Sequence, residues 1–191
     1  STPVMVDRSG TPLALLPELS ENPDAMFILW KDHTAAQEAA EINELAHSWP
    51  VDYTQYSGGS YSSEWFWAKA LHVMRNDALV REQAFSIVEH CDWMPALLTG
   101  NTDPIKMKRS RCAAGHKAMW NAEWGGFPSQ EFLSAIDPLF DGYRSHISNE
   151  TDTADTLAGY LTEEWSTRLG LPRQVAVAVG VIDAHSGAIG A

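Results

Sequence analysis

The sequence predicts an α/β domain, because strand-like apolar runs lie near both ends of the chain and helical patterns fill its middle. Residues 3–7 and 175–182 are the clearest of these runs. The chain has 191 residues, which is enough for one domain with a sizeable core, or at most for two small ones.

The N-terminal quarter is predicted to hold three strands and one helix. Residues 3–7 and 12–16 flank Gly10, which can take a positive φ, so the pair indicates a β-hairpin. The continuous apolar run 26–30 is typical of a buried strand. Residues 34–47 have the apolar spacing of a surface helix, with Thr34 as its N-cap.

That helix is expected to place Glu38, Glu41 and Glu44 on its outer face. The next helix is predicted to begin with Ser62 or Ser63 as its N-cap.

Helices are predicted to continue through the middle of the chain. Residues 77–90 repeat the helical spacing, and residues 92–98 form a short helix that ends at Gly100. Two more short helices are predicted at 130–136 and 161–169, and the second of them ends at Gly170.

Residues 175–182 form the strongest predicted strand, which is expected to be a central strand covered on both faces. It ends on Asp183, and the glycine-spaced residues that follow indicate the start of a helix. The chain also begins at Ser1 directly within an apolar run. We therefore expect this sequence to be part of a larger protein.

Composition and charge argue against several classes of function. The chain has 13 Lys+Arg and 25 Asp+Glu, and its net charge of −12 disfavours general binding to nucleic acid or to an anionic membrane. Its longest apolar runs fall far short of the roughly 18–20 residues that span a bilayer. Two cysteines without an apolar leader favour a cytoplasmic protein with both thiols free.

Asp183 is the sharpest candidate for chemistry. In open α/β sheets ligands gather at the carboxyl ends of strands, and a helix N-terminus there favours negative charge. A carboxylate in that position can accept a hydroxyl proton during phosphoryl transfer. Strand–Asp–helix junctions are common, however, and the spacing alone favours a simple helix cap.

Three other features have competing interpretations. The basic cluster 106–111 can hold an anionic or polyhydroxylated ligand, but a solvated basic face is the commoner explanation. The polar residues 31–33 follow the predicted strand 26–30, so they can share a cleft with Asp183 or simply form a polar loop. A zinc site is disfavoured because its four candidate ligands lack structural-zinc spacing; these are His90, Cys91, Cys112 and His116.

Five blocks of sequence, in order, resemble the FGGY carbohydrate kinase family. They are residues 29–34, 61–69, 91–100, 111–117 and 183–188. The resemblance implies an α/β ribonuclease-H-like domain of the actin/hexokinase type, partial and with a large helical insertion. It also implies a kinase that uses ATP and Mg²⁺ to phosphorylate a small pentulose.

The resemblance further implies roles for individual residues. Asp183 would be the catalytic base, and Lys117, expected to be an accessible lysine, would contact the ketose. The remaining residues implied in substrate binding line the sugar pocket; they are Met5, Trp30, Lys31 and Asp32.

The family's first strand and phosphate hairpin should precede Ser1, and its nucleotide domain should follow Ala191. Residues 1–191 would then be an incomplete N-terminal sugar-binding domain, inactive in isolation and without bound ATP or Mg²⁺. The alternatives are another pentulose or polyol kinase, or a non-catalytic sugar-binding fragment. We expect no nucleic-acid or membrane partner, and a homodimer is the candidate assembly.

Overall fold

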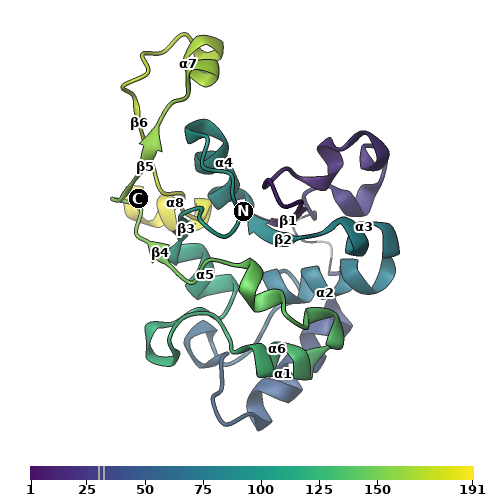
Figure 1. Ribbon diagram of the computed structural model, residues 1–191. Coiled ribbons are helices and arrows are strands. Elements are labelled where there is room, and N and C mark those ends of the chain that lie inside the picture. Colours follow the sequence, from purple (N-terminus) through teal and green to yellow (C-terminus); the bar gives the residue numbers. More distant parts are fainter. Residues whose placement is uncertain (30, 32) are drawn as a thin grey trace.

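The computed structural model describes residues 1–29, 31 and 33–191, which form a mixed α/β structure (Figure 1). The helices in this part of the chain are α1 Ala36–Ser48, α2 Phe66–Asn76, α3 Ala78–Gln83, α4 His90–Thr99, α5 Arg111–Lys117, α6 Gln130–Ile136, α7 Glu163–Leu169 and α8 Asp183–Gly190. The strands are β1 Pro3–Val6, β2 Ser86–Glu89, β3 Arg109–Ser110, β4 Thr151–Asp152, β5 Leu157–Tyr160 and β6 Ala176–Ala178.

The strands pair into small sheets of two strands each. The antiparallel pair β1–β2 is buried along its whole length and lies at the centre of the molecule. Strands β3 and β4 pair in parallel. The antiparallel pair β5–β6 and helix α7 form an arm that extends from the body in Figure 1.

The predicted N-terminal hairpin is wrong, although its turn is present. Gly10 has φ +79°, and a Cβ added there would lie 1.8 Å from the carbonyl oxygen of Thr102, so the turn requires glycine. Residues 12–16 contribute a 3₁₀ turn, Leu13–Leu15, and only one isolated bridge joins Val6 to Pro12. The true partner of β1 is β2, which comes much later in the sequence.

The prediction of one helix over residues 77–90 is also wrong, because the segment divides into α3 and β2. Ile87 packs in the main hydrophobic core, whereas its neighbour Val88 packs in a second cluster with Val4 and Val6. The strand therefore buries both of its faces. A strand buried on both faces has no alternating pattern, and a short apolar run of this kind is compatible with a helix.

The two other predicted buried strands also require correction. Residues 26–29 form no strand, the side chain of Leu29 is exposed, and Trp30 lies outside the described residues. Within the run 175–182 only β6 is a strand; it pairs with β5 alone, and two of its three residues are exposed. A central position would need further strands beside β6, and the described residues supply none.

The helices are predicted better than the strands. Helix α6 spans the predicted residues, and α4 and α7 end at glycines in the left-handed conformation, Gly100 and Gly170. Two starts are shifted: α1 begins at Ala36 with Ala35 as its N-cap, and α2 begins at Phe66 instead of following a serine cap. Within the described residues no helix is both long and apolar enough to cross a membrane.

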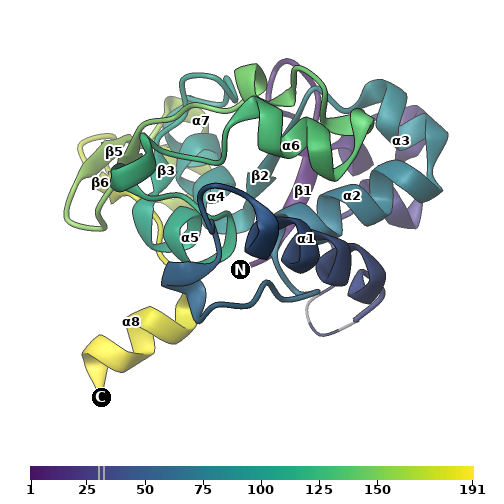
Figure 2. The ribbon, with the colours of Figure 1, turned by 90° about the horizontal axis from the view of Figure 1, so that it is seen from below.

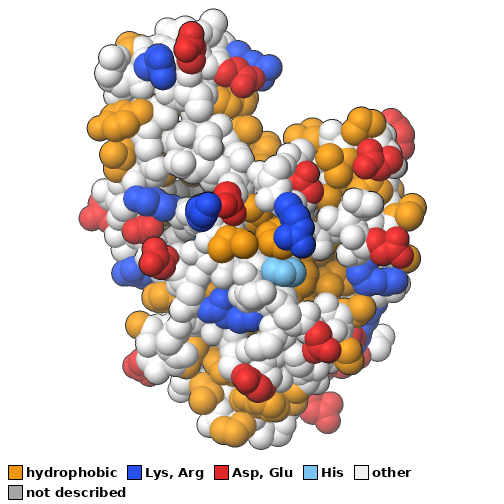
Figure 3. Space-filling view, in the orientation of Figure 1, with side chains coloured by type: hydrophobic (Ala, Val, Ile, Leu, Met, Phe, Trp, Pro, Cys, Tyr) orange, Lys and Arg blue, Asp and Glu red, His pale blue; other side chains and the backbone are white. Residues whose placement is uncertain are grey.

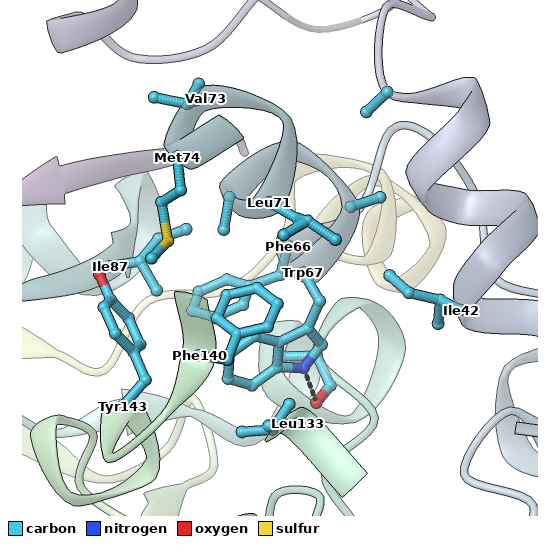
Figure 4. Packing of buried hydrophobic residues seen from close by; sticks show 14 of the residues in the cluster. Ile42, Phe66, Trp67, Leu71, Val73, Met74, Ile87, Leu133, Phe140 and Tyr143 are labelled. Atoms are coloured by element: carbon cyan, nitrogen blue, oxygen red, sulfur yellow. Dashed lines mark hydrogen bonds between the residues drawn. The ribbon is translucent and has the colours of Figure 1, made fainter. Parts of the chain in front are cut away.

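The main core lies where α1, α2 and α6 meet (Figure 4). Trp67 is fully buried there, and its indole Nε1 donates a hydrogen bond to the carbonyl oxygen of Ala118 at 2.9 Å. Its ring packs edge to face against Phe140, with centroids 5.4 Å apart. This bond and these contacts fix α2, and with it the chain that leads to β2.

Glu38 does not lie on an outer face as predicted, because α1 turns it toward α2. It is 5% exposed, with Oε1 3.2 Å from His72 Nδ1 and 3.8 Å from Arg75 Nη1. Arg75 also pairs with Glu41 at 2.7 Å. A polar residue on a helix can thus be buried when the neighbouring helix supplies partners for it.

Candidate active site

Four residues that are distant in sequence meet at Ser1, just before β1. Ser1 N lies 3.1 Å from Asp183 Oδ1, and Ser1 Oγ donates to Glu89 Oε2 at 2.6 Å. Lys117 Nζ donates to the carbonyl oxygen of Ser1. Asp183 and Lys117 therefore lie on either side of a single residue. We call Ser1, Glu89, Lys117 and Asp183 the Ser1 cluster.

The pairing of β1 with β2 builds this cluster. Pro3 is opposite Glu89 in the antiparallel register, and His90 N donates to the carbonyl oxygen of Thr2 at 2.9 Å. The beginning of β1 and the end of β2 are therefore adjacent. The last residue of α5 and the first residue of α8 come to the same place, so the cluster joins ends of four elements.

Asp183 is the exposed member of the cluster. It is in the first turn of α8, whose N-cap is Ile182, and its side chain is 84% exposed. Helix α8 has no buried residue and projects away from the body in Figure 2. The pKa of Asp183 is lowered first by the Ser1 amino group, whose charge exists only at a chain terminus, and further by backbone N–H groups at the helix start. Asp183 is therefore ionised near neutral pH.

Lys117 is buried and not accessible as expected, because it closes α5 against the interior with 5% of its surface exposed. Its Nζ lies 3.6 Å from Glu89 Oε2 in addition to its bond to Ser1. Its own carbonyl oxygen accepts a hydrogen bond from the hydroxyl of Tyr61 at 2.5 Å. The ammonium group is thus held by Ser1 and by Glu89 of β2, and Tyr61 fixes the backbone of the same residue.

Glu89 is the residue that the sequence reasoning missed. It ends β2, is 2% exposed, and its Oε1 has no hydrogen-bond partner among the described residues. One signal could have identified it. Val88-Glu89 repeats the pattern of Ile182-Asp183, in which an apolar run ends on an acid, but the interpretation of 77–90 as a helix concealed this pattern.

A second buried ion pair lies beside the cluster. Asp92 Oδ2 is 3.8 Å from Arg109 Nη1, and Asp92 Oδ1 accepts the backbone N–H of Ser110 at 2.7 Å. Burial raises the pKa of Asp92 to about 7, against the opposing effects of Arg109 and Ser110. Burial also lowers the pKa of Arg109. Desolvation therefore outweighs the attraction between these two groups.

The structure places Met5 away from the Ser1 cluster. Its side chain is 1% exposed in the main core, where the hydroxyl of Tyr143 lies 3.7 Å from its sulfur. Met5 therefore stabilises β1 from the core side, and its side chain is not available to a ligand.

The loop that was expected to line the sugar pocket is described only in part. Lys31 is exposed, with φ +62°, and its backbone N–H donates to Glu64 Oε2 at 2.6 Å. Glu64 Oε2 also lies 3.3 Å from Nζ of the buried Lys69. Trp30 and Asp32 lie outside the described residues.

The basic cluster 106–111 does not form one charged face. Arg109 is buried, Arg111 donates to the backbone carbonyl of Thr151 at 2.7 Å, and Lys106 pairs with Asp103. Figure 3 likewise shows side chains of both signs interspersed over one face of the molecule. Within the described part of the chain, no three His, Cys, Asp or Glu residues are placed to hold a metal ion.

Comparisons with known proteins agree with this fold. No family model matches the chain. The ribulokinase of Vibrio parahaemolyticus is 56% identical over 192 residues, which cover 100% of this chain and 34% of the relative. The ribulokinase of Shouchella clausii is 37% identical over 96% of this chain and 32% of its own length. The chain thus spans about a third of the length of these curated relatives.

Solved sugar kinases share the fold at low sequence identity. The xylulose kinase of Bifidobacterium adolescentis matches with a TM-score of 0.69 and 15% identity, over 98% of this chain and 40% of its own. The gluconate kinase of Lactobacillus acidophilus matches with a TM-score of 0.62 and 16% identity, over 83% and 30% respectively. The predicted fold, part of an actin/hexokinase-like sugar kinase, is confirmed.

These findings identify the class of protein, because the chain has the fold of the carbohydrate kinases. Within that class, the chain is homologous to the ribulokinases along its whole length, which agrees with its resemblance to the FGGY carbohydrate kinases.

The buried Asp92 predicts a pH-dependent stability. Its folded-state pKa of about 7 exceeds the ordinary value of 3.8, so between these values the folded state holds a proton that the unfolded chain releases. Asp92 thus stabilises the fold at low pH, and this contribution is lost as the pH rises through about 7.

We expect Asp92→Asn, which cannot ionise, to flatten the decline in the free energy of unfolding between about pH 4 and 7, measured with urea. The control is Asp103→Asn, because the pKa of Asp103 is lowered and it stays ionised over this range. Equal slopes for wild type and Asp92→Asn would contradict the prediction.

Proposed function

We propose that this chain supplies the sugar pocket and the catalytic base of a ribulokinase, which transfers a phosphoryl group from ATP to the terminal hydroxyl of L-ribulose and yields L-ribulose 5-phosphate. The observation that carries the proposal is homology to ribulokinases along the whole chain, at 56% identity in one relative. The Ser1 cluster supports it independently, because it brings an ionised carboxylate and a fixed ammonium group together.

The proposed role of Asp183 follows from its exposure and charge. An exposed carboxylate can reach a ligand, and its place in the first turn of α8 favours the ionised form before the reaction. An ionised carboxylate of this kind is a weak base. This is acceptable in phosphoryl transfer, because the transition state is loose and the nucleophile needs orientation more than early deprotonation. Asp183 therefore orients the hydroxyl and takes its proton as the new bond forms.

Lys117 is proposed to bind the ketose. An ammonium group has three N–H donors. One donates to the carbonyl oxygen of Ser1 and another faces Glu89, which leaves a third for an oxygen of the sugar. Ser1 lies between Lys117 and Asp183. The ammonium group of Lys117 would therefore hold the sugar close to the base, Asp183.

In this proposal Trp30, Lys31 and Asp32 complete the pocket, as the family resemblance implies. Met5 supports the pocket through the position of β1 and makes no direct contact, since it is buried in the core.

We assign the acceptor half of the reaction to this chain, as an incomplete sugar-binding domain. ATP and Mg²⁺ are the phosphoryl donor and the metal that the family implies. The described residues contain no group of three metal-ligating side chains, but Mg²⁺ is commonly held by one or two carboxylates together with substrate phosphates. Cytoplasmic L-arabinose catabolism is the proposed setting, which the two free cysteines support.

The second candidate is another pentulose kinase, favoured by the structural match to xylulose kinases. Assays of the full-length enzyme that contains this chain separate the two. We expect the kcat/KM for L-ribulose to exceed those for ribitol and xylulose. A higher kcat/KM for xylulose would replace the first candidate with the second, and no turnover of any of these sugars would favour a non-catalytic sugar-binding protein.

Asp183→Asn keeps the shape of the side chain but removes the base. Loss of a general base typically costs about 10²–10⁴-fold, so we expect kcat of the full-length enzyme to fall by that factor while sugar binding changes little. The control is Asp155→Asn, an exposed acid in the turn before β5. A variant that retains more than about a tenth of wild-type kcat, with chemistry rate-limiting, would reduce Asp183 to a structural residue.

Lys117→Met removes the ammonium group but keeps much of the apolar stem. We expect the KM for the sugar to rise more than kcat falls, because the lost hydrogen bond already exists in the ground state. Lys108→Met is the matched control, since Lys108 donates to the carbonyl oxygen of Leu157 on the arm. An unchanged KM in steady-state assays would show that Lys117 does not touch the bound sugar.

A further inference from the structure

Glu89 has an environment that the pairing of the strands does not require. The backbone of β2 already makes the hydrogen bonds that join it to β1. The Glu89 side chain is nevertheless buried, with one carboxylate oxygen that has no partner among the described residues. Burying a charged group in this way costs free energy, so its presence calls for a second role.

The contacts of the other carboxylate oxygen show where that role lies. Oε2 accepts the hydroxyl of Ser1 at 2.6 Å and lies 3.6 Å from Nζ of Lys117. Lys117 in turn donates to the carbonyl oxygen of Ser1. Among the described residues, Glu89 is therefore the carboxylate that contacts both the proposed sugar-binding lysine and Ser1, the residue beside Asp183.

Glu89 also disturbs its surroundings electrostatically. Its charge adds to the burial that raises the pKa of Asp92 and of the thiol of Cys91, so two neighbouring groups are harder to ionise because Glu89 is there. Lys117 is its close counter-charge. A cluster that combines a fixed cation with costly buried acids is typical of a functional site.

We propose that Glu89 is a positioning residue: it fixes the ammonium group of Lys117 and Ser1, just before β1, in the geometry that receives the sugar. The inference rests on the proposed function, since it concerns how the same site holds its substrate. Glu89 acts through Lys117. The carboxylate holds Nζ of the lysine against the carbonyl oxygen of Ser1, the residue whose nitrogen contacts Asp183.

The test is a double-mutant cycle in the full-length enzyme. Glu89→Gln keeps the size of the side chain and an acceptor for Ser1 but removes the counter-charge of Lys117. The cycle compares Glu89→Gln, Lys117→Met and the double variant by their KM for L-ribulose, their KM for ATP and their kcat. Thermal unfolding of each variant is measured in parallel.

The chain supplies a matched control, Glu38→Gln. Glu38 is also a buried glutamate with one unpartnered carboxylate oxygen, but its partners are His72 and Arg75, on α2. A general effect of neutralising a buried glutamate would appear in both variants. An effect through Lys117 would appear only in Glu89→Gln.

We expect Glu89→Gln to raise the KM for L-ribulose about tenfold, with less than about a twofold change in the KM for ATP. In the Lys117→Met background the same substitution should add less than about twofold. An unchanged KM for L-ribulose, or effects of the two substitutions that multiply, would overturn the proposal. An equal rise in KM for Glu38→Gln would overturn it as well.

Two further arms keep the test decisive. If Glu89→Gln does not fold, Glu89→Asp replaces it, because the shorter side chain retains the charge but withdraws it from Lys117. A KM for L-ribulose that rises in Glu89→Asp, but rises no further when Lys117→Met is added, supports the proposal. An unchanged KM overturns it. If the wild-type enzyme prefers another sugar to L-ribulose, the proposed function has failed by itself, and the same cycle with the preferred sugar still tests Glu89.

Discussion

The pairing of β1 with β2 is the constraint on which the rest of the structure depends. Its two faces are packed differently: Met5 and Ile87 lie in the main core, whereas Val4, Val6 and Val88 form a second cluster. A slip of one residue would exchange these faces, so packing fixes the register. The register in turn places Ser1 beside Glu89, and the ends of α5 and α8 meet there.

Local features of the structure could be predicted from the sequence, and distant pairings could not. The extent of α6, the glycine ends at Gly100 and Gly170, and the helix that begins at Asp183 depend on neighbouring residues and were anticipated. The partner of β1 depends on residues 86–89, far along the chain. Nothing in the local spacing of that segment separates a doubly buried strand from a helix.

The same difference explains the candidate site. Asp183 was found because a strand end, a helix start and a family motif coincide in one stretch of sequence. The burial of Lys117 depends on contacts with Ser1, Tyr61 and Glu89, which come from three other parts of the chain. Met5 was misplaced for a related reason. Alternate residues of a strand point to opposite faces, and its register in the sheet decides which face meets the core.

The two acids of the Ser1 cluster differ in burial, and their proposed roles differ for that reason. Glu89 and Asp183 both end an apolar run, and both contact Ser1 within hydrogen-bonding distance. Asp183 is exposed at the start of a helix, so it can meet a ligand and exchange a proton with it. Glu89 is enclosed, and a carboxylate in that environment is most effective in holding a cation. In the proposed function, the same residue chemistry thus serves as a base at the start of α8 and as an anchor at the end of β2, because the packing around each differs.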